Sequence, residues 1–238
     1  MNKIGIALGT VGVLAVLGVL TVTVGSGVVV TETQSVLGVQ DIHLKGQGQI
    51  ILRQGETESL TIEAEDNVMN FIETEVSRDR LTLRFKTGPF RTVVPRKGVK
   101  YFLTLSDPRE VVISGSGSLD VNDIDVDDFT ARVNGSADAS IQNIRADRLV
   151  SDINGSGKFL VTGRVSEQRI EISGSGNYRA EELTSEVARV RISGSGKTEI
   201  NVREELDVRI SGSGEVLYRG SPRVTQQISG SGNIVNQG

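Results

Sequence analysis

Residues 189–200 read RVRISGSGKTEI, and the phrase at their centre, ISGSG, recurs throughout the second half of the chain. Some copies have Val for Ile, Asn for the first Ser or Ala for the last Gly, and successive copies are 18–20 residues apart. The seven copies begin at Ile113, Val133, Ile153, Ile172, Ile192, Ile210 and Ile228. So regular a period is typical of a repeat protein in which each copy marks one structural unit.

The residues around each copy alternate between inward and outward types. In the unit of Ile192, Val190 precedes the motif by two residues, and Thr198 and Ile200 follow six and eight residues after Ile192. The matching positions of the other units are mostly apolar. A period of two is typical of β-strands, and about 20 residues leave no room for a crossover helix. We therefore predict an all-β fold, a single-stranded parallel β-helix (β-solenoid), with seven coils of about 18–20 residues over residues 113–238.

Each motif is predicted to form a corner of its coil, because glycine tolerates positive φ and a close approach of backbone. Ala137 replaces the second Gly in one copy, which indicates a need for a small residue there rather than for positive φ. Stacked coils would align the first Gly and the middle Ser in columns, where a hydroxyl can donate to one neighbour and accept from the next. This predicted corner ladder consists of Gly115, Ser116, Gly135, Ser136, Gly155, Ser156, Gly174, Ser175, Gly194, Ser195, Gly212, Ser213, Gly230 and Ser231.

Composition excludes several classes of function. The 238 residues contain no cysteine, so a disulfide framework, a Cys-ligated zinc site, a cysteine nucleophile and an iron–sulfur cluster are all excluded. A single histidine, His43, argues against a His-rich metal site and a Ser-His-Asp triad, and the residue is expected at the surface or in packing. The net charge of −4 gives no sign of nucleic-acid binding. We predict no catalytic, cofactor-binding or metal-binding residue and no cofactor.

Two weaker candidates for chemistry are considered. The acidic run Asp120, Asp123, Asp125, Asp127 and Asp128 is interleaved with apolar residues, and it is expected to be a solvated connector rather than a cation site. A polysaccharide-cleaving β-helix would need a carboxylate pair or clustered basic residues in a groove. Folding could assemble such a site from Asp152, Arg148 and Arg169, so this function is kept as an alternative.

Residues 1–30 are predicted to form an N-terminal hydrophobic helix, because Lys3 is the only charged side chain before Glu32. This segment is a signal-anchor or a cleaved signal peptide, and either one directs the rest of the chain out of the cytoplasm. Residues 31–38 are expected to be a polar linker.

Residues 39–112 lack the motif but carry strand patterns separated by turn residues. We predict irregular N-terminal β coils and a cap here, since terminal repeats are commonly atypical. Residues 87–98, which contain two prolines, are predicted to leave the coil. The expected strands are 39–44, 49–53, 59–64, 72–76, 80–86 and 99–105.

The same region carries a family resemblance. The stretches GQIILRQG (48–55), LTIEAEDN (60–67), ETEV (73–76) and LTL (81–83), followed by the SGSG coils, resemble the head GIN domain family, whose members are called putative auto-transporter adhesins. The resemblance covers roughly residues 36–238 and implies an exported bacterial β-helix, right-handed, without catalytic residues to carry over. Right-handedness also agrees with the usual bias of parallel crossovers.

These observations favour a non-enzymatic, exported cell-surface or periplasmic β-helix protein with an adhesin-like binding or structural role. Alternatives are a polysaccharide-binding or polysaccharide-cleaving β-helix, and an extracytoplasmic sensor or scaffold domain with a membrane partner. The expected partners are a glycan or a cell-surface protein, the membrane through the N-terminal helix, and a second copy through the open solenoid end or a side face. No nucleic-acid partner is expected.

Overall fold

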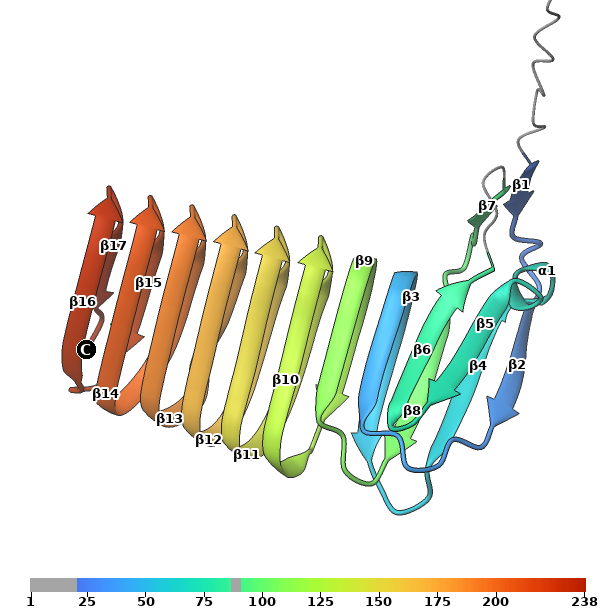
Figure 1. Cartoon of the computed structure of the whole chain (residues 1–238), viewed down its shortest axis with the longest axis horizontal. Helices are drawn as coiled ribbons and strands as arrows, with labels where there is room; N and C mark the ends of the chain where they lie inside the picture. The colour runs from blue at the N-terminus through green and yellow to red at the C-terminus, as the bar shows by residue number, and fades with distance from the viewer. Residues whose placement is uncertain (1–20, 87–90) are drawn as a thin grey trace, which may run out of the picture.

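The structure is a computed structural model that describes residues 21–86 and 91–238, and most of these residues lie in β-strands (Figure 1). The elements are β1 (Thr21–Val24), β2 (Val29–Gln34), β3 (Asp41–Gln54), β4 (Ser59–Glu65), α1 (Asp66–Met69), β5 (Ile72–Ser77), β6 (Arg80–Phe85), β7 (Arg91–Val94), β8 (Lys100–Leu105), β9 (Glu110–Asn122), β10 (Asp125–Gly135), β11 (Asp138–Gly155), β12 (Lys158–Gly174), β13 (Asn177–Gly194), β14 (Lys197–Gly212), β15 (Glu215–Arg219), β16 (Arg223–Gly230) and β17 (Asn233–Asn236).

The strands from β9 onward form the predicted β-solenoid. Strands of successive coils pair in parallel, and the motifs lie in register, with Ile153 beside Ile172, Ile172 beside Ile192 and Ile192 beside Ile210. The coils stack side by side in one column (Figure 1). From the first SGSG corner to the last, the solenoid makes about six turns. The prediction of an all-β solenoid with coils of about 20 residues is therefore confirmed, with about six turns in place of seven coils.

Each coil has two long sides that meet at the glycine corner. The leading face is the outer surface of the segments before that corner, such as 150–155, 169–174, 189–194 and 207–212. The trailing face is the outer surface of the segments after it, such as 118–122, 138–142 and 197–201. A short third side, containing Val126, Ala146 and Val165, returns the chain to the next leading segment.

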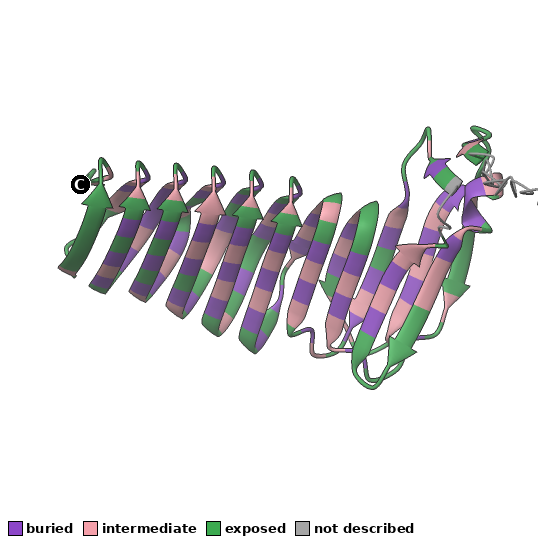
Figure 2. Ribbon diagram, turned by 45° about the horizontal axis from the view of Figure 1, so that its top comes forward, coloured by how far each residue is buried: buried purple, intermediate pink, exposed green. Residues whose placement is uncertain are grey.

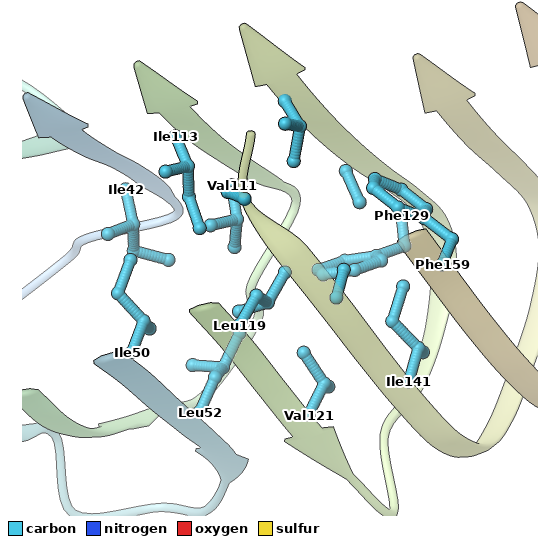
Figure 3. Packing of buried hydrophobic residues seen from close by; sticks show 14 of the residues in the cluster. Ile42, Ile50, Leu52, Val111, Ile113, Leu119, Val121, Phe129, Ile141 and Phe159 are labelled. Atoms are coloured by element: carbon cyan, nitrogen blue, oxygen red, sulfur yellow. The ribbon is translucent and has the colours of Figure 1, made fainter. Parts of the chain in front are cut away.

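Alternating side chains of these segments fill the interior of the column. The predicted inward positions are buried in the complete coils, which Figure 2 shows as alternating buried and exposed bands along each strand. Figure 3 shows residues of both long sides meeting in this core, with Ile42 and Val111 from one side and Leu52 and Val121 from the other. Alternation thus places one set of side chains in the core and leaves the other set on two outer faces.

The first coil of the column is β3, which the sequence pattern did not identify as a motif-bearing coil. β3 pairs with β9 over its whole length, and Gly46, Gln47 and Gly48 lie beside Gly115, Ser116 and Gly117. A G-x-G corner is therefore present at 46–48, although it lacks the serines. The long segment 55–109 is inserted between this first coil and the next one.

The inserted segment folds as a cap at the end of the column. β8 pairs in parallel with β3, but β4 pairs with β8 in antiparallel orientation, and β2 pairs with β4 in the same manner. On the other half of β3, β6 pairs in parallel, and β5 and β6 form an antiparallel hairpin. The expected strands are present, with 39–44 and 49–53 joined as β3. Within 39–112, β3 is a coil of the column, whereas β4 and β5 pair in antiparallel orientation and are not coils.

The predicted N-terminal helix is wrong for the part that the structure describes. Residues 1–20 lie outside the described residues, and residues 21–24 and 29–34 are strands β1 and β2 instead of helix and linker. The sequence of β1 alternates between Thr and Val, at Thr21, Val22, Thr23 and Val24. All four residues are β-branched, and β-branched residues favour strands. β1 pairs in parallel with β7, which lies in the segment predicted to leave the coil. No helix within residues 21–86 and 91–238 is long and apolar enough to cross a bilayer.

Candidate functional site

The glycine corners require glycine for two reasons. The first Gly of every motif has a positive φ, between 121° at Gly230 and 140° at Gly135. A Cβ on Gly194 would lie 2.4 Å from the carbonyl oxygen of Gly174 in the preceding coil. The second Gly of each motif has no positive φ, and Ala137 is accommodated there fully buried, which agrees with the prediction that this position requires a small residue.

The serine column is held by its backbone. The N–H of Ser195 donates to the carbonyl of Gly174 at 2.8 Å, and Ser213 and Ser231 donate in the same way to the glycines of their preceding coils. The serine side chains at these corners are exposed, and no hydrogen bond joins successive hydroxyls of the described motifs. The side-chain ladder of the sequence prediction is therefore replaced by a ladder of main-chain bonds, which leaves the hydroxyls facing solvent.

A second set of corners was not predicted from the sequence. Asp123 and Asn143 adopt positive φ of 54° and 55°, and in the next coil Gly163, which is in register with Ile144, has a positive φ of 130°. The Nδ2 of Asn143 donates to Oδ1 of Asp123 at 3.0 Å. Asp and Asn tolerate this conformation better than most residues with a side chain, and their recurrence at Asp123 and Asn143 was an available signal.

The acidic run does not form a site. Asp120 accepts a hydrogen bond from Nε2 of Gln49 on the trailing face, whereas Asp123 lies at the second corner and Asp128 faces Arg148 at 3.9 Å. Within residues 21–86 and 91–238, no group of three or more His, Cys, Asp or Glu side chains could hold a metal ion. The carboxylates are distributed over different sides of the coil because the chain turns at Asp123, between the trailing segment and the third side.

His43 lies beside an ion network on the leading face. Its Nε2 is 3.5 Å from Oε2 of Glu110, and the other carboxylate oxygen of Glu110 accepts from Nη1 of Arg132 at 2.5 Å. The Nε of Arg132 donates to Asp152 at 2.7 Å, and this hydrogen bond raises the pKa of the guanidinium. The network joins the adjacent strands β3, β9, β10 and β11, so these residues stabilise the stacking of coils.

The three residues considered for polysaccharide cleavage lie on the same face but have different partners. Asp152 and Arg148 are on β11, and Arg169 is on β12, beside Val150. Asp152 is bound by Arg132, and Arg169 lies 3.7 Å from Glu171. The structure therefore does not join the three side chains in one constellation.

A depression of about 230 Å³ lies further along the leading face. It is lined by arginines from three successive coils, with strands β12 and β13 as its floor. Its lining residues are Arg169, Ile170, Arg189, Val190, Arg191, Asp207 and Arg209. Of these arginines, only Arg169 belongs to a site predicted from the sequence, because the others come together only when charged residues are aligned coil by coil.

Two other depressions have mixed character. One of about 290 Å³ on the trailing face lies between Asp138, Lys158, Leu160 and Arg179, where acidic and basic groups are balanced. Another, of about 340 Å³, lies between the corner of β3 and the loop at Pro95–Val99. The charged side chains that line the second depression are Lys97 and Lys100, whereas the arginine depression brings together four arginines and Asp207.

The fold and its surfaces define an all-β solenoid with an antiparallel cap and charged lateral faces. The family described as putative auto-transporter adhesin, head GIN domain, matches residues 39–222, and the chain belongs to this family. This confirms the resemblance found in the sequence. No curated protein matches the chain.

Solved structures share this fold. A putative adhesin from Bacteroides fragilis NCTC 9343 is 22% identical with a TM-score of 0.83, and the match covers 90% of this chain and 99% of that one. A putative lipid binding protein from Parabacteroides distasonis ATCC 8503 is 22% identical with a TM-score of 0.72, covering 90% and 100%. A putative adhesin from Parabacteroides merdae ATCC 43184 is 21% identical with a TM-score of 0.70, covering 90% and 98%.

Proposed function

We propose that this protein is a non-enzymatic, exported binding scaffold with an adhesin-like role at the cell surface or in the periplasm. The observation that supports this proposal is the in-register stacking of the coils, which arranges outward side chains in straight columns on two broad faces. Stacked repeats are widely used as extended recognition surfaces. Membership in a family described as adhesins favours the same role.

Binding rather than catalysis is proposed because the charged groups that the first coils place on the leading face are engaged with one another. Glu110, Arg132 and Asp152 form a continuous set of short ion pairs across three coils. General acid–base catalysis requires a group whose proton is available to a substrate within hydrogen-bond reach. These side chains are better suited to stabilising the scaffold.

The experiment that tests this role is display of the full chain on a non-adherent bacterium, followed by counting of cells attached to host-cell and polysaccharide-coated surfaces. Attachment above that of cells displaying an unrelated solenoid is the expected result. Equal attachment on every surface would contradict the adhesin-like role. Release of reducing ends from a polysaccharide by the purified chain would contradict the absence of catalysis.

A second candidate function, contact with lipid, is favoured by one apolar surface. Val22 and Val24 on β1 and Val94 on β7 are exposed by 54%, 45% and 44%, and the parallel register places them on one side of this two-stranded sheet. Exposed apolar patches mark interaction surfaces. Flotation of the full chain with neutral phosphatidylcholine vesicles tests this candidate, and loss of flotation in a Val22→Ser, Val24→Ser variant is expected.

A further inference from the structure

We propose that the arginine depression on the leading face binds a carboxylated sugar unit of an acidic polysaccharide. This inference rests on the proposed binding function and assigns it a ligand class and a site. The depression combines three features: guanidinium groups from successive coils, a free arginine at the centre, and carboxylates beside the arginines.

The arginines form a compact array because of the register of the coils. Arg169 on β12 lies beside Arg189 on β13, and Arg191 on β13 lies beside Arg209 on β14. Neighbouring strands are about 4.8 Å apart, and residues two apart on one strand are about 7 Å apart on the same face. The four arginines therefore follow a zigzag across three coils, with Glu171 beside Arg191 and Asp207 beside Arg189.

Arg191 is the member of the array that is available to a ligand. It is exposed, and it makes no hydrogen bond or ion pair with any residue of 21–86 and 91–238. Arg209 faces Asp207 at 3.4 Å and Arg169 faces Glu171 at 3.7 Å, and both arginines are more than half exposed. Such exposed pairs are weak, so these arginines can turn toward a bound carboxylate. Guanidinium groups bind carboxylates through two parallel hydrogen bonds.

The carboxylates near the array favour a sugar over a uniform polyanion. Arg189 is paired with Glu167, so acidic groups lie at Glu167, Glu171 and Asp207 around the arginines. A sugar presents hydroxyl donors for these carboxylates as well as an acidic group for the arginines. A planar anionic membrane or a nucleic acid would bring its charges against the same carboxylates, and the chain has a net charge of −4.

The size of the depression fits one sugar unit. Its volume of about 230 Å³ is smaller than the roughly 300–1,000 Å³ of pockets that enclose drug-sized ligands. A polysaccharide could place one acidic unit there while its neighbours extend along the flat leading face. Binding should weaken with salt, because the groups are exposed to solvent.

The test is isothermal titration calorimetry of the full chain with polygalacturonate oligosaccharides, dextran sulfate, neutral dextran and vesicles of phosphatidylglycerol. We expect binding of polygalacturonate oligosaccharides and none of neutral dextran. Arg191→Gln should weaken that binding at least tenfold, and so should Arg189→Gln. The matched control is Arg203→Gln, since Arg203 is also exposed and unpaired among the described residues but lies outside the depression. That variant should bind like the unchanged chain.

Several outcomes would overturn the inference. If Arg203→Gln weakened polygalacturonate binding as much as Arg191→Gln, binding would depend on overall charge and not on the depression. If Arg191→Gln bound as tightly as the unchanged chain, the binding site would lie elsewhere. Binding of dextran sulfate or vesicles in preference to the carboxylated sugar would refute the ligand class. The result is separable from the adhesin-like role. Cells that attach without polygalacturonate binding would refute only the site, and binding without attachment would refute only adhesion.

Discussion

The carbonyl oxygen of Gly46 occupies the space that a Cβ on Gly115 would need, at 2.1 Å from its ideal position. The two glycines are neighbours in the stack, although strands β4 to β8 lie between them in the chain. Gly46 has the same kind of backbone conformation, with φ of 122° against 138°. A Cβ there would meet only the Phe85 ring, at 3.8 Å. Alanine substitutions at these two glycines therefore separate the free-energy cost of the positive φ from the cost of a clash between stacked coils.

Gly115→Ala is expected to destabilise the protein by about 3–5 kcal/mol, because it combines a strained positive φ with a clash against backbone. Gly46→Ala should cost about 1–2 kcal/mol, since only the conformational part applies. Urea denaturation of both variants gives the comparison. Equal losses would mean that the close contact between coils adds nothing to the requirement for glycine.

The second glycine of the motif should tolerate alanine better than the first. A Cβ on Gly196 would press against a side-chain methyl of Ile172 at 2.6 Å, and its φ is not positive. Repacking of that isoleucine should limit the cost of Gly196→Ala to about 1–2 kcal/mol, below that of Gly194→Ala. Thermal melting of the two variants checks the order. A larger loss for Gly196→Ala would contradict the role assigned to Ala137.

The solenoid could be predicted because its determinants are local and repeated. Ile, Val and Leu at alternating positions define the strands, and the glycine motif marks each corner. The corner at Gly46 was missed because Gln47 replaces serine, yet the G-x-G spacing was visible. The partners of β4 and β5 could not be predicted. Their alternation gives a strand but does not say whether it pairs parallel or antiparallel.

Arg132→Gln should destabilise the stack by about 1–3 kcal/mol, because it removes the charged donor shared by two largely buried carboxylates. The side chains of Glu110 and Asp152 are only 19% and 18% exposed. The control is Arg148→Gln, whose partner Asp128 is 3.9 Å away and well exposed. That change is expected to stay within about 0.5 kcal/mol. Similar losses in chemical denaturation for both variants would contradict the network's role.

Glu65 is predicted to fasten the N-terminal segment to the cap. Its carboxylate is fully buried and accepts from the backbone N–H groups of Gly27 at 2.9 Å, Arg96 at 2.8 Å and Lys97 at 3.4 Å. Glu65→Ala leaves these donors without their acceptor and should lower the free energy of unfolding by about 1–3 kcal/mol. Amide hydrogen exchange should accelerate at these three residues.

The control for this prediction is Glu63→Gln, on the same strand, whose partner Lys100 is 3.0 Å away and half exposed. Exchange at Gly27 should be unchanged in that variant. If the Gly27 amide were still protected from hydrogen exchange in Glu65→Ala, another contact would hold the N-terminal segment to the cap.

Glu199 should make stability depend on acid pH. The hydrogen bond from Lys197, at 2.7 Å, holds the pKa of Glu199 below its ordinary value of 4.5. A lowered folded-state pKa contributes stability above pH 4.5 that is lost as the pH falls through the folded pKa. Glu199→Gln should therefore cost about 1 kcal/mol at pH 7 and progressively less as the pH falls below 4.5.

Denaturation curves at several pH values test this expectation. Glu204→Gln is the control, because Glu204 is exposed and makes no hydrogen bond or ion pair with a described residue. The stability of Glu199→Gln is compared with that of the unchanged chain. If this difference in the free energy of unfolding stayed constant from pH 7 to pH 3, the role of the Glu199 carboxylate would be contradicted.

The arginine depression could have been predicted from the sequence, but it was not. Aligning the coils by their first glycines places Arg169 beside Arg189 and Arg191 beside Arg209, because the register is constant from coil to coil. The ion pairs could not be predicted in this way. Whether Arg191 stays free while Arg209 turns toward Asp207 depends on side-chain rotamers, which strand patterns do not determine.

The insertion between β3 and β9 has a consequence for the order of folding. From β9 onward, each leading segment pairs with the one about 20 residues earlier, so each added coil closes only a short loop. Joining β9 to β3 instead requires a loop that contains β4 to β8, and contacts so distant in sequence form slowly. Once the cap has met β9, the column can grow by zippering toward its C-terminal end. The junction of cap and column is therefore the expected kinetic bottleneck, and destabilised variants at Gly115 should refold more slowly than variants at Gly194.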